Sequence, residues 1–220
     1  MTAPRRPATD KGRSAPRLYL VTPPLDTSAL AAKLAEALAA ADVAAVLARR
    51  PTDGDAHLIE RVRALAPAVQ DRGIAFLIEG HLESVEPAGA DGAHVTGIAA
   101  FDAALPLLKP RYIVGCGGLT SRHDAMVTGE RGAAYVTFGE PDPEGRRPAF
   151  AAVLDRVAWW AELFEIPCVG WAMNLDEVAV LAGAGADFVA IADAVWTHPQ
   201  GPGAAMATAA ARLKTSEPVP

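Results

Sequence analysis

Side chains that could do chemistry lie at the ends of short apolar runs in this chain. The cationic, acidic and imidazole candidates are Arg49, Arg50, Glu79, His94, Arg146 and Arg147. Arginine side chains hold phosphate groups, a carboxylate can carry a proton or bind Mg²⁺, and a histidine can transfer a proton near neutral pH. If the fold brings the ends of these runs together, the residues predict a site for small phosphorylated ligands.

A second set of candidates consists of small residues in turns. Gly117, Gly118 and Ser121 follow the apolar run 112–116, and Asn174 follows a later run. Turns of this kind expose backbone N–H groups that can bind phosphate where a helix begins. The sequence contains no zinc-ligand spacing, nucleophile elbow or P-loop. These turns are therefore candidate phosphate-binding positions.

Some of these candidates also have an ordinary structural explanation. Arg49 and Arg50 stand before Pro51 and could be a surface pair, and His94 could be a hydrogen-bonded core histidine. The choice depends on whether these residues lie at one end of a common sheet. It therefore depends on the elements that carry them.

A repeated segment organises the chain. Residues 88–97 read AGADGAHVTG, and residues 131–139 and 184–192 repeat the order of an alanine-rich stretch, a glycine and a β-prone apolar run. A glycine can take the left-handed conformation that ends a helix. Each segment therefore predicts a helix, a tight turn and a buried strand. Repeated units of this kind form a parallel sheet with helical crossovers.

Eight apolar runs alternate with eight segments of helical character. The predicted strands cover residues 17–22, 43–48, 74–78, the end of 88–97, 112–116, 135–138, 168–172 and 188–192. This alternation predicts a single (β/α)8 TIM barrel of the α/β class over residues 17–214, with a doubly wound open sheet as the alternative. Residues 1–16 are expected to be a disordered tail and residues 215–220 a C-terminal tail. All strands of a barrel end at one face, where the candidate residues would meet.

Composition and charge argue against two classes of partner. The 220 residues carry a net charge of −6 although residues 1–16 are basic, so the barrel region is acidic, which argues against nucleic-acid binding. No apolar run approaches the ~18 residues that span a bilayer, and residues 1–16 lack the apolar core of a signal peptide. We therefore expect a cytoplasmic protein that does not bind membranes. Cys116 and Cys168 lie in apolar runs and are interpreted as core residues.

Trp159 lies opposite the apolar stripe of the predicted helix that includes Phe150, Val157 and Phe164. A large aromatic side chain on that side either packs under a neighbouring element or marks a subunit interface. We favour the interface, and we therefore expect a homo-oligomer.

Four motifs together resemble those of one protein family. They are LYLVT at 18–22, GADGAHV at 89–95, AYVTFG at 134–139 and AGADFV at 184–189. In this order and spacing they are similar to the barrel shared by thiamine phosphate synthase and its thiazole tautomerase relatives. The resemblance implies a transferase of thiamine biosynthesis that joins an aminopyrimidine diphosphate to a thiazole phosphate and releases pyrophosphate. It also implies that Mg²⁺ binds the diphosphate.

The resemblance suggests roles for particular residues. The implied catalytic residues are Arg49, Glu79 and His94, the implied metal ligands are Asp102 and Glu79, and the implied phosphate-binding residues are Arg50, Gly117, Gly118, Ser121, Arg146, Arg147 and Asn174. Several positions depart from the family pattern: the basic motif at 49–51 lacks the family's lysine, Ser121 is displaced, and Arg146 and Arg147 are the only basic replacement for a missing Thr-x-Thr-Lys run. Gly80 stands where the family has a metal-binding aspartate, with Glu79 beside it, and Trp171 stands in the usual Gly-Gly phosphate loop.

Three functions are compatible with this sequence. The first is a divergent thiamine phosphate synthase-like transferase. The second is an isomerase like the thiazole tautomerases, in which a histidine such as His94 or His123 transfers the proton. The third is a non-catalytic barrel that binds a ligand or a partner, because a fold does not by itself fix a function.

Overall fold

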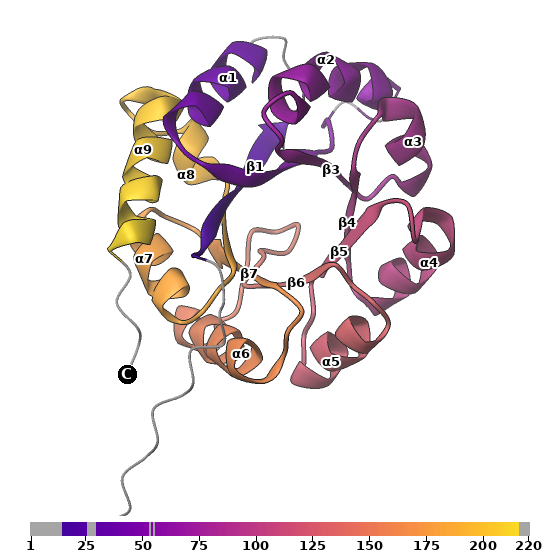
Figure 1. Cartoon of the computed structure of the whole chain (residues 1–220), viewed down its shortest axis with the longest axis vertical. Coiled ribbons are helices and arrows are strands. Elements are labelled where there is room, and N and C mark those ends of the chain that lie inside the picture. Colours follow the sequence, from indigo (N-terminus) through magenta and orange to yellow (C-terminus); the bar gives the residue numbers. More distant parts are fainter. Residues whose placement is uncertain (1–14, 26–29, 53, 55, 216–220) are drawn as a thin grey trace, which may run out of the picture.

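Eight parallel strands close into a barrel, each strand pairing with the next and the last pairing with the first (Figure 1). The computed structural model describes residues 15–25, 30–52, 54 and 56–215. The strands are β1 (Arg17–Pro24), β2 (Val43–Arg49), β3 (Ala75–Glu79), β4 (Gly92–Thr96), β5 (Ile113–Gly117), β6 (Tyr135–Phe138), β7 (Cys168–Ala172) and β8 (Phe188–Ile191). The closed order confirms the predicted (β/α)8 barrel and excludes the open-sheet alternative.

Helices connect successive strands and surround the barrel (Figure 1). They are α1 (Leu30–Ala40), α2 (Leu58–Gln70), the 3-10 turn η1 (Leu82–Ser84), α3 (Val85–Ala88), α4 (Ile98–Leu108), α5 (Arg122–Glu130), α6 (Phe150–Leu163), α7 (Asp176–Gly183), α8 (Asp193–Trp196) and α9 (Gly201–Lys214). Strands β6 and β7 have the predicted bounds, whereas β3 and β5 begin and end one residue later than predicted. The predicted tails lie almost entirely outside the described residues. Among the helices of the described ranges, none is long and apolar enough to cross a membrane.

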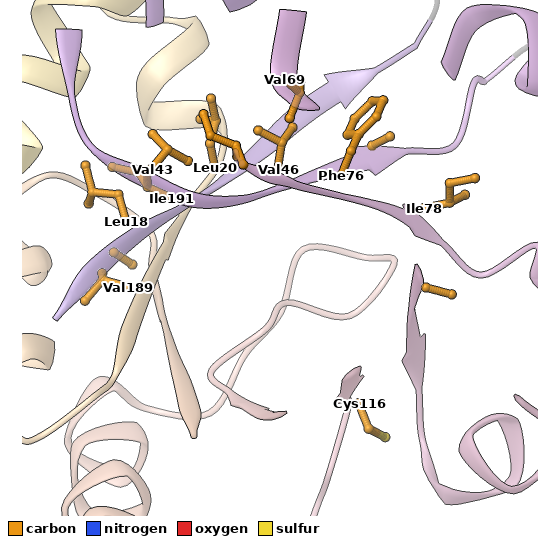
Figure 2. Close-up of a cluster of buried hydrophobic side chains, with 14 of the residues drawn as sticks. Leu18, Leu20, Val43, Val46, Val69, Phe76, Ile78, Cys116, Val189 and Ile191 are labelled. Atoms are coloured by element: carbon orange, nitrogen blue, oxygen red, sulfur yellow. The ribbon is translucent and has the colours of Figure 1, made fainter. Parts of the chain in front are cut away.

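Side chains of the strands alternate between the barrel interior and the surrounding helices, as the two-residue period of a strand requires. The buried interior layer consists of Tyr19, Val21, Ala45, Leu47, Leu77, Tyr135, Val169, Trp171, Ala190 and Ala192. The alternate residues pack against the helices: Figure 2 shows Val46 and Phe76 on the side of the sheet where Val69 of α2 lies. The same alternation determines which residues at the end of each strand point into the barrel.

The repeated Gly-Ala-Asp motif closes the turn between a helix and the next strand. Asp91 donates its backbone N–H to the carbonyl oxygen of Phe76 at 2.8 Å, and its carboxylate accepts the N–H of Phe76 at 2.7 Å. Asp187 makes the same two bonds to Cys168, at 3.0 and 2.8 Å. The two aspartates therefore hold neighbouring strands together at their amino-terminal ends, away from the outlet where the strands finish.

Candidate active site at the barrel outlet

Four of the predicted site residues lie on inward positions at or near the carboxyl ends of adjacent strands. Arg49 comes two residues after the inward Leu47, and Glu79 comes two residues after the inward Leu77. His94 is the register partner of Glu79 on β4 and is itself paired with Gly115 of β5. The alternation then places Gly117 inward as well. The fold therefore brings Arg49, Glu79, His94 and Gly117 to one end of the barrel, as predicted.

His94 is part of a buried chain of hydrogen bonds in the barrel interior. Its side chain is 2% exposed, and its Nδ1 atom lies 3.0 Å from the hydroxyl of Tyr135. The Tyr135 hydroxyl in turn lies 2.8 Å from the hydroxyl of Tyr19. On the other side of the ring, Nε2 lies 3.2 Å from Oε1 of Glu140, whose side chain is 10% exposed. The chain runs from Tyr19 through Tyr135 and His94 to Glu140.

The proton positions in this chain follow from the chemistry of its members. Burial raises the pKa of both phenols, Tyr19 and Tyr135, above their ordinary value of 10.0, so both keep their protons at neutral pH. A carboxylate only accepts hydrogen bonds, so the N–H of His94 belongs on Nε2, facing Glu140. With a neutral His94 ring, Nδ1 then accepts from Tyr135, and Tyr135 accepts from Tyr19. Each described group of the chain is satisfied in this arrangement except Oε2 of Glu140, which is buried without a hydrogen-bond partner in the protein.

Two glycines of β5 make room for this chain. A Cβ atom on Gly115 would lie 1.9 Å from the ring carbon Cζ of Tyr135. A Cβ atom on Gly117 would lie 1.9 Å from Oε2 of Glu140 and 2.8 Å from Nε2 of His94. Any larger residue at either position would displace the buried chain. Gly117, predicted as a phosphate-binding residue, therefore has a steric role beside Glu140.

The residues at the ends of β2 and β3 contact neighbouring strand ends: Arg49 is the last residue of β2, Arg50 follows it, and Glu79 is the last residue of β3. The backbone N–H of Arg49 donates to Oγ1 of Thr22 at 3.1 Å, and its guanidinium lies 3.6 Å from the carboxylate of Asp193. The side chain of Arg49 is 35% exposed, so this cation faces solvent at the outlet. The backbone N–H of Arg50 donates to Oε2 of Glu79 at 3.1 Å. Glu79 thereby holds the outlets of β2 and β3 together.

The outlet of β7 is closed by an internal ion pair. Arg147 bonds both carboxylate oxygens of Glu177, at 2.5 and 3.0 Å, and its guanidinium also donates to the carbonyl oxygen of Trp171. The Glu177 carboxylate accepts the backbone N–H of Met173, and Asn174 accepts the backbone N–H of Glu177 at 3.1 Å. Both charged side chains are largely buried. Glu177 thus occupies the guanidinium of Arg147 and the backbone N–H of Met173, so these predicted phosphate-site donors are already paired within the protein.

Arg146 is engaged within its own loop. Its guanidinium pairs with Asp142 at 2.9 Å and with Glu144 at 3.0 Å. Hydrogen bonds from the Arg146 backbone and side chain hold the pKa of Asp142 below its ordinary value. In this structure the basic side chain therefore has two acidic partners close to it in sequence.

Ser121 and Gly118 shape the turn after β5. Ser121 caps α5: its Oγ accepts the N–H of Asp124, and the Asp124 carboxylate accepts the N–H of Ser121. Gly118 has a φ angle of +63°, which favours glycine, and a Cβ there would meet the side chain of Thr96 at 2.3 Å. Both residues therefore have local structural roles at the outlet.

Asp102 lies on α4, where its carboxylate pairs with Arg131 at 2.5 Å. Both side chains of this pair are close to half exposed. The structure thus gives Asp102 a partner from the helical shell, and binding of a metal ion would require this pair to open. Its assignment as a metal ligand stays a prediction.

Tyr19 and Tyr135 were not among the predicted site residues, and no specific role was predicted for Glu140. The two tyrosines lie within apolar runs that predict buried strands, and Glu140 is one of several charged residues in a polar loop. The signal that could have found them is the spacing of Gly115 and Gly117, because two glycines on the same face of a strand mark the close approach of large groups from elsewhere.

Comparison with known proteins identifies what this barrel is similar to. A family model described as thiamine monophosphate synthase matches residues 18–195. The thiamine-phosphate synthase of Rhodospirillum centenum is 41% identical over 195 residues, which cover 87% of this chain and 94% of the relative. The thiamine-phosphate synthase of Hyphomonas neptunium is 38% identical over 217 residues, which cover 93% of this chain and 94% of the relative.

Solved structures with similar folds have much lower sequence identity. A thiamine phosphate pyrophosphorylase from Pyrococcus furiosus superimposes with a TM-score of 0.73 at 19% identity, covering 90% of this chain and 95% of that one. A 3-hexulose-6-phosphate synthase gives a TM-score of 0.73 at 17% identity, covering 89% of this chain and 99% of that one. At these identities the similarity concerns the fold alone.

Proposed function

Because the chain belongs to the thiamine monophosphate synthase family, we propose that it is a thiamine-phosphate synthase, joining an aminopyrimidine diphosphate to a thiazole phosphate. The observation that carries this proposal is the match to two relatives of that name along 94% of their length. The gathering of Arg49, Glu79 and His94 at the barrel outlet supports it, since ligands of this fold bind at that end.

The proposed reaction breaks the bond between the methylene carbon on the aminopyrimidine ring and a diphosphate oxygen, and it forms a bond from that carbon to the thiazole nitrogen, which supplies the new electron pair. The oxygen keeps the electron pair of the broken bond, so negative charge grows on the departing pyrophosphate while positive charge grows on the aminopyrimidine. A fixed cation near the oxygen lowers the energy of this transition state. Arg49 is a partly exposed cation at the outlet. Its backbone N–H is bonded to Thr22, and its guanidinium lies 3.6 Å from the carboxylate of Asp193. We assign it to the diphosphate.

Mg²⁺ is the cofactor that the family implies, and the outlet fits an ion carried by the diphosphate. Within the described ranges, no three His, Cys, Asp or Glu side chains gather into a group that could hold a metal ion. Magnesium usually takes one or two carboxylates and completes its shell with phosphate oxygens and water. Glu79 would supply the carboxylate, and the bound ion would neutralise charge on the pyrophosphate.

Replacement of Asp102 by alanine tests whether Asp102, the second predicted metal ligand beside Glu79, binds Mg²⁺. If Asp102 binds Mg²⁺, the variant needs a higher Mg²⁺ concentration for half-maximal turnover. The same dependence in variant and wild type would remove Asp102 from the metal site and leave Glu79.

A second candidate function is a barrel that binds a ligand without turning it over. The specific observation in its favour is the Arg147–Glu177 pair, because two groups at the β7 outlet are already satisfied by each other. The isomerase alternative rests on His94 or His123, and His94 is buried between Tyr135 and Glu140. Isomerisation of the thiazole by the wild type that is lost when His94→Ala and His123→Ala are combined would support it, and retained isomerisation would exclude it.

Three further expectations belong to this proposal. We expect phosphorylated small-molecule substrates, a cytoplasmic location and a homo-oligomer. Trp159 is half-buried, packs against Trp160 and Phe164, and lies under the guanidinium of Arg122 at 4.9 Å. Its outer face is the predicted subunit contact. A lower sedimentation mass for Trp159→Ser would support this contact, and an unchanged mass would end it.

The direct test is product formation. Purified protein is incubated with aminopyrimidine diphosphate, thiazole phosphate and Mg²⁺, and pyrophosphate and thiamine phosphate are measured. We expect both products in equal amounts. Folded protein that forms neither would favour the non-catalytic barrel.

A further inference from the structure

One polar atom at the outlet is left without a partner. Oε1 of Glu140 faces Nε2 of His94, but Oε2 is buried and accepts no hydrogen bond from the described protein. Nine-tenths of the Glu140 side chain is buried. Buried acceptors in native proteins are normally paired with protein, water or ligand. An orphaned carboxylate oxygen in a candidate active site therefore indicates a place for a donor that comes from outside the chain.

The position of this oxygen is fixed from two sides. His94 holds the other oxygen of the same carboxylate, and His94 is itself held by Tyr135. Oε2 lies against Gly117, where a Cβ atom would come within 1.9 Å of it. Gly117 is the last residue of β5, so Oε2 lies at the level where the barrel opens.

A second unsatisfied polar atom lies on β6, the strand that precedes Glu140 in the chain. Oγ1 of Thr137 is also buried without a hydrogen-bond partner in the described protein. Thr137 comes two residues after the inward Tyr135 and therefore shares its face of β6. The inward side chain at the neighbouring outlet of β7 is Trp171, which is buried. Two unsatisfied polar atoms therefore come from β6 and the residues just after it, and Trp171 lies on the inward face of the neighbouring strand, two residues beyond the register partner of Thr137.

We propose that Glu140 Oε2 accepts a hydrogen bond from the amino group of an amino-substituted heteroaromatic ring. An ionised carboxylate can only accept, so its partner must be a donor. An amino group on a ring supplies such a donor, whereas a metal ion would need further ligands, and the described residues contain no such cluster. The inference deepens the proposed function and rests on it for the identity of the ring, the aminopyrimidine. Glu140 is then a specificity-determining residue.

The test compares the wild type with Glu140→Gln. The amide oxygen of glutamine can keep the bond from His94, while its NH₂ group would stand where Oε2 was and would face the ligand's amino group as a second donor. Binding is measured for the aminopyrimidine alcohol, which lacks the diphosphate, and for its analogue with a methyl group in place of the amino group. We expect the wild type to prefer the amino compound by on the order of 10- to 100-fold, as a hydrogen bond to a charged group allows.

Glu140→Gln should bind the two compounds equally, and Gly117→Ala, whose methyl group displaces Oε2, should also lose the preference. Glu86→Gln, an exposed carboxylate paired with Arg111, serves as the matched control and should keep it. Absence of any preference in the wild type, or a preference retained in Glu140→Gln, would overturn the inference.

The same samples are assayed for thiamine phosphate. Product without amino selectivity defeats this inference alone, and selectivity without product defeats the proposed function alone.

Discussion

Tyr19, Tyr135 and Cys116 are buried weak acids that keep their protons to a higher pH in the folded protein than in the unfolded chain. Burial raises the pKa of both phenols above 10.0 and raises the pKa of the Cys116 thiol from 9.0 to about 12. In the unfolded chain these groups ionise at their ordinary values. Each group therefore contributes stability that is fully present below its unfolded pKa and is lost as the pH rises through its folded pKa.

We predict that the free energy of unfolding falls as the pH rises from about 9 to about 12. Each group can contribute up to about 1.4 kcal/mol per pH unit between its two pKa values. Urea unfolding at a series of pH values measures this slope. Tyr19→Phe should reduce the slope above pH about 10 because one of the three acids is removed. A flat profile would contradict the assignment of buried, protonated phenols.

At the residue scale, the sequence predicted the outlet side chains that belong to strands. Arg49, Glu79 and His94 could be placed because each lies at or near the end of an apolar run, and parallel strands share one direction. The partners of these residues could not be predicted in the same way. Glu140 meets His94 across 46 positions of sequence, and the position of its side chain depends on the loop after β6 and on the space left by Gly117.

The repeated Gly-Ala-Asp motif gives a prediction at the scale of elements. Asp91 accepts the N–H of Phe76 and a hydrogen bond from Gln70, so its removal would leave a partly buried strand amide unpaired. Asp91→Ala should lower the free energy of unfolding by about 1–3 kcal/mol, measured with urea. Asp155→Ala, which removes one partner of an exposed ion pair with Arg122, should cost less than about 1 kcal/mol. Equal losses would mean that Asp91 does not fix the strand.

The ion pair at the β7 outlet gives a second prediction at this scale. Glu177→Ala would leave the largely buried Arg147 without its counter-charge and the Met173 N–H without its acceptor. Removal of one partner of a buried pair costs about 3–5 kcal/mol, so the unfolding midpoint in urea should fall clearly. Glu86→Ala removes an exposed partner of Arg111 and should leave the midpoint nearly unchanged. A Glu177→Ala midpoint equal to that of this control would show that the pair is not structurally important.

Element positions were predictable because helix and strand periods are local properties of the sequence. The bounds of β6 and β7 matched to the residue. The short helix α8, after β8, was not predicted, since four residues are too few to show a helical period. The capping pair of Ser121 and Asp124 was also missed, although its spacing is a recognised signal.

The whole molecule is a closed barrel with its structural aspartates at one end and its candidate chemistry at the other. Asp91 and Asp187 join strands at the amino-terminal end, where Gln70, Ile74, Asp91 and Ile113 line an open hollow of about 350 Å³. Arg49, Glu79 and Glu140 lie at the outlet. Sequence alone predicted the barrel because the repeat recurs around it, whereas the reaction depends on which outlet side chains stay available for substrate.

The central claim is that this outlet is the active site of a thiamine-phosphate synthase. The most direct test is the initial rate of thiamine phosphate formation by the wild type, Arg49→Ala and the control Arg111→Ala, whose exposed side chain pairs with Glu86. We predict turnover by the wild type, a loss of kcat/KM on the order of 100-fold in Arg49→Ala, and a wild-type rate in the control. A wild type without turnover, or an Arg49→Ala variant as fast as the control, would contradict the claim.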